Sequence, residues 1–335
     1  AVFWMWVVAF LGAATAYTES TLAQIYKEND RGQYRGGPAY YFEKFFGGRF
    51  GKFYGILVAI SFIISCGLFL PGVQSNGVVK AITGITGEGT MVNTAFGAVG
   101  TNTLVVTLVM VLILGLIIFG GIKRIARVAE FVVPLMALGY ILFAVLIVLF
   151  IIHLLPNIIS LIVGDAFTAQ AGLGAAIGWG VKRGVYSNEA GQGTGPHHAG
   201  AAEVEHPAQQ GMVQAFSVYV DTLFVCSATA FMILMTGMYN IQGTLPEGQF
   251  LVQNVDAATI ISGPAFTQMA VSSIFGSFGN TFVAVAVFFF SFTTIMAYYY
   301  IAEVNVAYLT RSIKTTGALF FIKLVLIFAV AYGAI

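Results

Sequence analysis

Eight apolar stretches along the chain are long enough, or nearly so, to cross a lipid bilayer as helices. Such a helix needs about 20 residues, because it rises only about 1.5 Å per residue. The predicted spans are residues 2–26, 53–80, 103–121, 131–155, 172–186, 211–237, 273–306 and 317–335. The fifth is short and rich in glycine, and the seventh is long enough to tilt. The pattern therefore predicts an all-α integral membrane protein with about eight transmembrane segments.

The composition agrees with a chain whose surroundings are mainly lipid. Of its 335 residues, 58% are hydrophobic and 9% are charged, and the mean hydropathy is +0.88. Soluble domains carry about 25% charged residues, so a large soluble core is excluded. The net charge of +1 gives no reason to expect a nucleic-acid partner.

Basic residues in the loops indicate an orientation. Eleven Lys and Arg lie in loops that share one side if every segment crosses once, namely 27–52, 122–130 and 307–316. The loops on the opposite side, 81–102, 156–171 and 238–272, contain none. Cytoplasmic loops are enriched in Lys and Arg. We therefore expect a multi-pass protein of the cell membrane (plasma or inner), with these basic loops cytoplasmic and residue 1 near the outer face.

The first basic loop contains the segment GGPAYYFEKFFGG. Pro38 suits the first turn of a helix, and the aromatic residues that follow would form one face. We expect an interfacial helix lying along the cytoplasmic surface of the membrane.

Polar residues inside the second predicted span follow helical spacing. Gly67, Pro71 and Gln74 fall at i, i+4 and i+7, and Asn76 follows. Pro71 has no N–H to donate to the carbonyl of Gly67, which predicts a bend with a free carbonyl. Gln74 and Asn76 could then hold a polar ligand, or only bond to neighbouring helices.

The sixth and seventh spans carry two further polar stripes. In the sixth, Asp221 is either an ion or proton site or a structural carboxylate capped by hydroxyls. In the seventh, Ser291, Thr294 and Tyr298 share one face, with Thr293 adjacent. Hydroxyl and carbonyl oxygens suit Na⁺, a hard cation, but the hydroxyls could equally bond back to their own helix.

The fifth span is unusual because ten glycines fall between Gly164 and Gly200. Each interior glycine costs a helix about 1 kcal/mol relative to alanine, and irregular backbone at membrane depth needs protein or a cavity around it. A discontinuous helix is therefore expected, of the kind that forms substrate sites in secondary transporters. A phosphate-binding loop is excluded because no soluble strand and no GK[ST] motif accompany these glycines. His197 and His198 lack a third metal ligand and are interpreted as loop residues.

Several segments in the same order resemble the alanine or glycine:cation (sodium) symporter family. They are GGPAYYFE (36–43), GVQSN (72–76), GIKRIARVAE (121–130), GWGVKRGVYSNEAGQGTGPHHAGAA (178–202), VQAFSVYVDTLFVCSATAFMIL (213–234) and FTTIMAYYYIAE (292–303). The resemblance implies a leucine-transporter-like fold with two inverted repeats. The chain would be a single transporter domain, with residues 1–171 in the first repeat and 172–335 in the second. It starts without a Met and ends within an apolar stretch, so we expect it to be truncated at both ends, without the first core helix and the last helices of that fold.

The resemblance also implies site residues. Gln74 matches a glutamine that lines the substrate pocket, Trp179 and Gly180 lie in the broken helix, and Thr294 and Tyr298 match a Thr–aromatic pair. With Asn76, these form the expected substrate site. For sodium, the resemblance suggests the carbonyl of Phe290 with the hydroxyls of Thr293 and Thr294.

The function implied is sodium-coupled symport of a small neutral amino acid, alanine or glycine, into the cell. Na⁺ is the expected coupling ion, with H⁺ as an alternative, and no enzymatic activity is expected. An intramembrane aspartyl protease would need Asp165 and Asp221 to face each other, but the predicted topology puts Asp165 in an outer loop. A channel is disfavoured because no filter motif or Arg-rich sensor helix is present.

Overall fold

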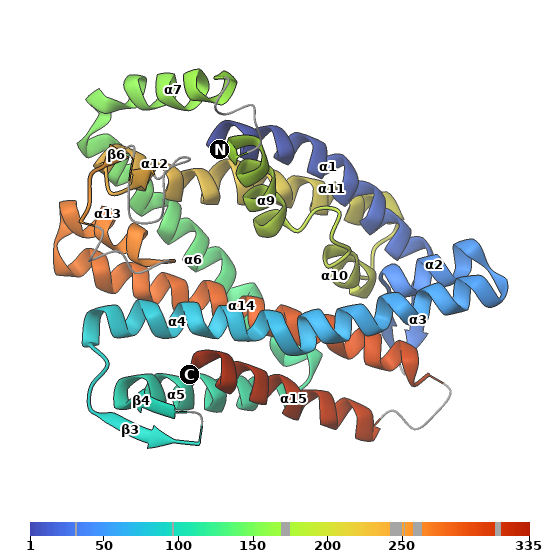
Figure 1. The fold of residues 1–335 in the computed structure, drawn as a ribbon. Helices are drawn as coiled ribbons and strands as arrows, with labels where there is room; N and C mark the ends of the chain where they lie inside the picture. The colour runs from blue at the N-terminus through green and yellow to red at the C-terminus, as the bar shows by residue number, and fades with distance from the viewer. Residues whose placement is uncertain are drawn as a thin grey trace. The chain divides into compact units, whose positions relative to one another are not determined.

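The computed structural model describes residues 1–30, 32–95, 97–168, 175–241, 250, 252–256, 263–311 and 316–335. These residues form helices and three two-stranded antiparallel hairpins (Figure 1). The α-helices are α1 (Val2–Ile25), α2 (Pro38–Phe46), α3 (Gly48–Ile64), α4 (Leu70–Thr86), α5 (Thr101–Ile118), α6 (Ile122–Phe150), α7 (Leu155–Gly164), α9 (Ala175–Asn188), α10 (Gly195–Ala201), α11 (Pro207–Tyr219), α12 (Ser227–Thr236), α13 (Ala265–Phe275), α14 (Ser277–Leu309) and α15 (Thr316–Ala334). The hairpins are β1 (Glu28–Asp30) with β2 (Gln33–Arg35), β3 (Met91–Thr94) with β4 (Gly97–Gly100), and β5 (Asn240–Ile241) with β6 (Val252–Gln253).

Seven helical runs in the described residues are long and apolar enough to cross a membrane. They are Val2–Ile25, Gly48–Thr86, Thr101–Ile118, Lys123–Phe150, Pro207–Thr236, Ser277–Leu309 and Gly317–Ala334. Each corresponds to a predicted span, which confirms the all-α membrane class. The eighth prediction, 172–186, falls on the shorter helix α9, and its first residues lie outside the described part of the chain.

The second span contains a π-helical turn, η1 (Ser65–Phe69), between α3 and α4. There the N–H of Leu70 donates to the carbonyl of Ser65, five residues earlier. The turn ends two residues before Pro71, which has no N–H and cannot continue the ordinary ladder. The predicted irregularity at Pro71 is therefore absorbed by widening the helix. A second π turn, η4 (Val220–Cys226), lies between α11 and α12.

Some elements lie where only loops were predicted. The segment 156–171 contains most of the short helix α7, and the segment 238–272 contains most of α13. The seventh span begins at Ser277 and not at residue 273, because Gly276, with φ 58°, separates α13 from α14. In the basic loop, α2 confirms the predicted helix and has Pro38 in its first turn.

The chain forms two compact units. The first comprises Ala1–Leu70, Leu161–Ser227 and Ala297–Leu326, and the second Pro71–Ser160, Ala228–Met296 and Ile327–Ile335. The assignment of 1–171 and 172–335 to two repeats is a separate matter and stays a prediction.

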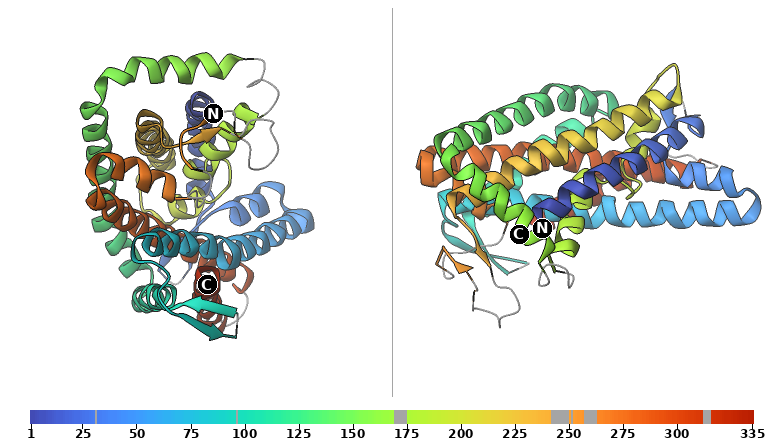
Figure 2. Two further views of the ribbon diagram at one scale, coloured as in Figure 1. Left: turned by 60° about the vertical axis from the view of Figure 1, so that its left-hand side comes forward. Right: turned by 90° about the horizontal axis from the view of Figure 1, so that it is seen from above.

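In the first unit, α1 packs along α11 and against α9 and α10 (Figure 2). Small side chains line this contact: Ala9, Ala13 and Ala16 of α1 cluster with Ala190 and Val218. Small residues let membrane helices approach closely, because lipid gives no hydrophobic force to hold them together. Close packing therefore fixes α1 against both halves of the glycine-rich segment.

In the second unit, aromatic rings and one buried amide hold the helices. The rings of Phe143 on α6 and Phe282 on α14 stack with centroids 4.1 Å apart. The side chain of Gln268 on α13 donates to the carbonyl of Ala81 on α4 at 2.8 Å. A buried amide is stable there because its N–H has a partner.

Candidate functional site

The glycine-rich segment is a helix broken between Asn188, the last residue of α9, and Gly195, the first of α10. Three residues of the break have left-handed backbone: Glu189 (φ 55°), Gly191 (φ 80°) and Gly193 (φ 77°). Asn188 supports the turn, because its Oδ1 accepts from the N–H of Ala190 at 3.1 Å. The predicted discontinuous helix is therefore present in the described residues.

Gly193 is required by space as well as by backbone angle. A Cβ added there would lie 2.8 Å from Cγ of Pro38 and 3.1 Å from Cζ of Phe62. Only glycine lets the break pass so close to the start of α2 and to α3. On the other side of the turn, Gln192 donates from Nε2 to the carbonyl of Val185 at 2.8 Å, which satisfies one open carbonyl at the end of α9.

Two carboxylates that the sequence analysis missed lie at the break. Glu19 of α1 accepts from the N–H of Gly191 at 3.1 Å. Glu189 accepts from the hydroxyl of Tyr298 at 3.3 Å. A signal was present in the sequence, because Glu19 is an acidic residue inside an apolar span, and such residues usually face the protein interior for a reason.

Asp221, in the π turn η4, is surrounded by donors. It accepts from Ser187 at 2.9 Å and from Thr222 at 3.1 Å, and the thiol of Cys226 lies 3.6 Å away. This arrangement favours the interpretation of Asp221 as a structural carboxylate, because its hydrogen bond with Ser187 joins α9 to the sixth span. Besides burial, the groups that act on Asp221 among the described residues are Ser187, Thr222 and Cys226 and do not include Asp165, so the two aspartates of the protease alternative are not brought together there.

A cavity of about 480 Å³ borders the break within the first unit. Glu19 and the backbone of Gly191 and Gly193 form one wall, and Tyr41 and Phe62 lie on others. Its walls are both polar and aromatic, which suits a small polar molecule or water. The Glu19 carboxylate therefore lines a space large enough for a small molecule.

His197 and His198 are not loop residues as predicted, because both lie in α10, and His197 is fully buried. Asn305 of α14 lies 2.8 Å from its Nε2 and also donates to the carbonyl of Ile301. Nε2 is therefore the acceptor, and Nδ1 faces the carbonyl of Thr194 at 3.2 Å. Burial lowers the pKa of His197 to about 4, so the imidazole is neutral at pH 7.

The described residues contain no group of three His, Cys, Asp or Glu side chains arranged to hold a metal ion. His197 joins α10 to α14 through Asn305. Carbonyls at the other end of α10 are also satisfied, because Gln24 and Lys27 donate to Ala202 at 2.9 Å and 2.8 Å.

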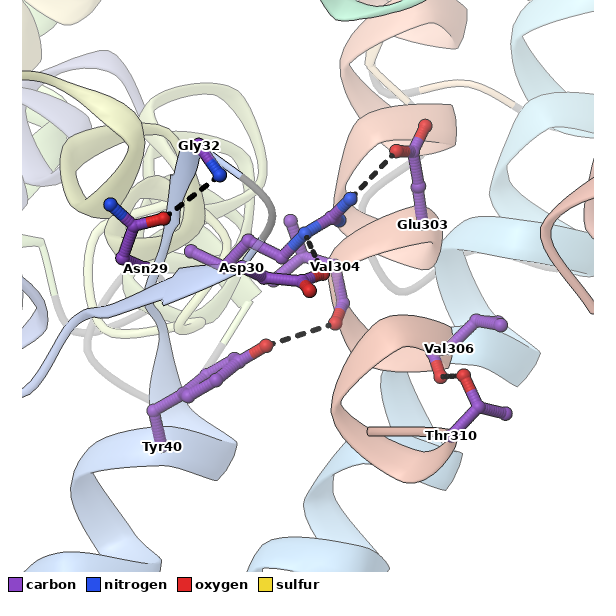
Figure 3. A network of polar contacts seen from close by, with 9 residues as sticks. Asn29, Asp30, Gly32, Tyr40, Glu303, Val304, Val306 and Thr310 are labelled. Atoms are coloured by element: carbon purple, nitrogen blue, oxygen red, sulfur yellow. Dashed lines mark hydrogen bonds and ion pairs between the residues drawn. The ribbon is translucent and has the colours of Figure 1, made fainter. Parts of the chain in front are cut away.

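A second polar network ties the β1–β2 hairpin to the end of α14 (Figure 3). Arg35 is buried and lies 3.2 Å from Oε1 of Glu303 and 3.0 Å from Oδ2 of Asp30. Tyr40 adds a hydrogen bond of 3.5 Å to the carbonyl of Val304. Further along, the hydroxyl of Tyr308 donates to Glu43 of α2 at 2.6 Å. These contacts hold the loop after α1 against α14.

The predicted substrate residues fall into both units. Gln74 and Asn76 are half-buried on α4. Trp179 on α9 is 51% exposed, with Nζ of Lys182 4.8 Å from its ring centre. Gly180 is buried where a Cβ would come within 2.7 Å of Trp4 of α1, so close packing alone explains this glycine.

Tyr298 is the predicted site residue that reaches the break, through its contact with Glu189. It is 3% exposed and packs against Cys66 and Ile301. The assignment of Tyr298, Thr294, Gln74 and the others to a substrate site stays a prediction.

The predicted sodium ligands lie together on α14. The hydroxyls of Thr293 and Thr294 are 3.0 Å and 2.9 Å from the carbonyl oxygen of Phe290. Both hydroxyls donate to this carbonyl. They thus bond back to their own helix, which was the alternative to a sodium site. Three hard oxygen atoms nevertheless lie close together, and this donor type fits Na⁺.

Comparison with known proteins agrees with this architecture. The model of the sodium:alanine symporter family matches residues 1–335. The chain therefore belongs to that family, which confirms the resemblance of the quoted motifs.

Among curated relatives, a putative sodium/proton-dependent alanine carrier protein, YrbD of Bacillus subtilis (strain 168), is 52% identical over 100% of the chain and 66% of its own length. A sodium/proton-dependent alanine carrier of Bacillus sp. (strain PS3) is 44% identical, over 100% of the chain and 72% of the relative. A probable sodium/glutamine symporter, GlnT of Bacillus subtilis (strain 168), is 40% identical, over 94% of the chain and 60% of the relative. The chain thus spans about two thirds of the length of these relatives, whose names describe transporters and not enzymes.

Proposed function

We propose that the protein is a secondary active transporter that carries a small neutral amino acid, alanine or glycine, into the cell together with Na⁺. The observation that carries this proposal is the helix broken between Asn188 and Gly195 inside an otherwise apolar chain. Broken helices expose main-chain groups and carboxylates within the membrane, where a small zwitterion and a cation need polar partners. Family membership and the names of the relatives support the same function.

Na⁺ would be held by the carbonyl of Phe290 and the hydroxyls of Thr293 and Thr294, and would supply a positive charge next to the amino acid. The hydroxyl protons can turn away from Phe290, which would free the lone pairs of its carbonyl oxygen for the cation and let the hydroxyl lone pairs point toward it. Substrate and Na⁺ can shift the transporter between its outward- and inward-open states only by binding one state more tightly.

The substrate would contact Gln74, Asn76, Trp179, Gly180, Thr294 and Tyr298. Side-chain amides and hydroxyls from this set could bond to the carboxylate and ammonium groups of the amino acid. The buried ring of Tyr298 would limit the space for a substrate side chain, which favours alanine or glycine over larger amino acids.

Uptake into proteoliposomes tests the proposal directly. The complete protein is reconstituted, and uptake of labelled alanine, glycine and glutamine is measured with and without an inward Na⁺ gradient. We expect gradient-dependent uptake of alanine or glycine. Uptake of glutamine alone would refute the small-substrate assignment, and equal uptake without the Na⁺ gradient would refute sodium coupling.

The basic loops would face the cytoplasm and residue 1 the outer side. Single cysteines at Lys52 and Thr90 test this orientation in intact cells with a thiol reagent that cannot cross the membrane. Thr90→Cys should react and Lys52→Cys should not. The reverse pattern would contradict the orientation.

A further inference from the structure

Two adjacent basic residues lie within α9, outside the basic loops. Of the 15 Lys and Arg in the chain, eleven lie in those loops, whereas Lys182 and Arg183 follow the first glycines of the broken helix. Both side chains are exposed, and neither forms an ion pair with a carboxylate within the described residues. Charged side chains in membrane segments are costly and usually have a function. The pair therefore needs an explanation beyond the orientation of the chain.

Both cationic groups lie at the ring of one exposed tryptophan. Nζ of Lys182 is 4.8 Å from the ring centre of Trp179, and Cζ of Arg183 is 5.5 Å from it. The ring attracts each cation, but two cations at one ring repel each other. An anion that contacts both would offset this repulsion. A carboxylate suits the position, because its two oxygen atoms can accept from an ammonium and a guanidinium group together.

The pair shares a face of α9 that leads toward the break. Trp179, Lys182 and Tyr186 follow at i, i+3 and i+7, so they lie along one side of the helix. Tyr186 in turn interacts electrostatically with Tyr298, the expected substrate residue that donates to Glu189 at the break. The basic pair and the break are thus connected along one face within the first unit.

The pair also lies toward the end of α9 that is proposed to be outer. A Cβ added to Gly180 would contact Ala1 at the start of α1, and one added to Gly184 would lie 3.4 Å from Val8. Lys182 and Arg183 fall between these two glycines. On the proposed orientation they therefore lie nearer the outer face than the break does, on the side from which a substrate would enter.

We propose that Lys182 and Arg183 bind the carboxylate of the amino acid on its way to the broken helix. The inference rests on the proposed function and deepens it, because it names the groups that meet the substrate before the break. Alanine and glycine are zwitterions without net charge at pH 7. The pair therefore acts at short range, holding the carboxylate end and turning the ammonium end away.

Uptake by intact cells that produce the complete protein tests the inference. Initial rates are measured against the concentration of labelled alanine at constant Na⁺, and cells without the protein give the background. Lys182→Gln/Arg183→Gln should raise the alanine concentration for half-maximal uptake by about fivefold, because two exposed charge contacts are lost. The maximal rate should stay the same, because the pair acts before the substrate reaches the break.

Ionic strength provides a readout that a purely structural role would not change. Salt screens exposed charges, so the half-maximal alanine concentration of the wild type should rise with ionic strength at constant Na⁺. That of the double variant should not. The conservative variant Arg183→Lys keeps the charge and should behave like the wild type. Arg49→Gln is the matched control, because it removes an exposed arginine of α3 and should change neither quantity.

A single charge reversal keeps the test decisive if the double variant does not accumulate in the membrane. Lys182→Glu should raise the half-maximal alanine concentration more than Lys182→Gln does, because it repels the carboxylate as well as removing an attraction. All rates are divided by the amount of protein in the membrane. Equal half-maximal concentrations for these two variants and the wild type would overturn the inference.

The remaining outcomes are also distinguishable. An unchanged half-maximal concentration in the double variant, or an ionic-strength dependence that persists in it, would overturn the inference. In proteoliposomes, a maximal rate that depends on anionic phospholipid in the wild type but not in the double variant would assign the pair to lipid headgroups and overturn the inference alone. Absence of sodium-driven uptake of alanine and glycine by the wild type would overturn the proposed function and the inference with it.

Discussion

Replacing Arg35 by methionine tests how the hairpin is held against α14. The guanidinium lies 3.2 Å from Glu303, and the two side chains are only 6% and 9% exposed. Methionine preserves most of the apolar stem and its volume. It removes the charge, so the Glu303 carboxylate is left buried without a counter-ion. Asp30, which is 37% exposed, can remain hydrated after the change.

The magnitude follows from this difference in burial. Breaking a buried ion pair by removing one partner costs about 3–5 kcal/mol, whereas replacing both partners by apolar residues is often close to neutral. The exposed contact with Asp30 adds at most about 1 kcal/mol. We therefore expect Arg35→Met to lose about 3–5 kcal/mol of stability. The double variant Arg35→Met/Glu303→Leu should recover most of that loss.

Thermal unfolding in detergent, followed at one fixed scan rate, measures the order of stabilities. Arg49→Met is the matched control, because Arg49 is exposed at the start of α3 and has no ion pair within the described residues. We expect the wild type, Arg49→Met and the double variant to unfold at similar temperatures. Arg35→Met should unfold at a clearly lower temperature. An Arg35→Met protein as stable as Arg49→Met, or a double variant as unstable as Arg35→Met, would refute the reasoning.

Three further predictions concern the break and the ion site. Gly193→Ala should lower the free energy of unfolding by about 1–2 kcal/mol because of its left-handed backbone angle, and by more because of its close contacts. Gly178→Ala, at a position in α9 with open space around it, is the control and should be neutral or stabilising in the same unfolding assay. Thr294→Ala should raise the Na⁺ concentration needed for half-maximal uptake. Thr281→Ala is the control, because it removes a similar back-bonded hydroxyl from the exposed start of α14 and should leave that concentration unchanged. Equal Na⁺ concentrations for the two variants would argue against the ion site. Burial lowers the pKa of His197 to about 4 from about 6.5, so the unfolded chain binds more protons than the folded protein between these pH values. The contribution of neutral His197 to folding stability is therefore complete above pH 6.5 and is lost as the pH falls toward 4. Unfolding midpoints measured across this range should fall less steeply for His197→Gln, and parallel curves would contradict the assignment.

The membrane spans could be predicted from the sequence because each is a long apolar run. Length and hydropathy alone place α1, α5 and α15 within a few residues of their observed bounds. The broken helix could also be predicted, since ten glycines between Gly164 and Gly200 make a continuous helix unfavourable. These are local properties of the chain, and local properties can be read from the sequence.

Contacts between distant segments could not be predicted in the same way. The hydrogen bond between His197 and Asn305 and the ion pair between Arg35 and Glu303 join residues far apart in sequence. Nothing in their local pattern specifies the partner, so His197 was interpreted as a loop residue. The π turn at Ser65–Phe69 was missed for another reason: it adds one residue to a helical turn without changing the apolar pattern.

The break in the glycine-rich helix has both of its ends fixed. The end of α9 is held by Ser187 to Asp221, and a Cβ on Gly200 near the end of α10 would lie 2.7 Å from the backbone of Gly36. A change of angle between the two half-helices must therefore be taken up as torsion in residues 189–194. The glycines there can rotate between left- and right-handed backbone at little steric cost. Glu189 differs, because its left-handed conformation (φ 55°) costs about 1–2 kcal/mol relative to right-handed backbone. Gly191 and Gly193 can therefore change their backbone conformation freely, whereas Glu189 is held in a strained one. Relief of that strain would return Glu189 to right-handed backbone and so extend the geometry of α9 to this residue.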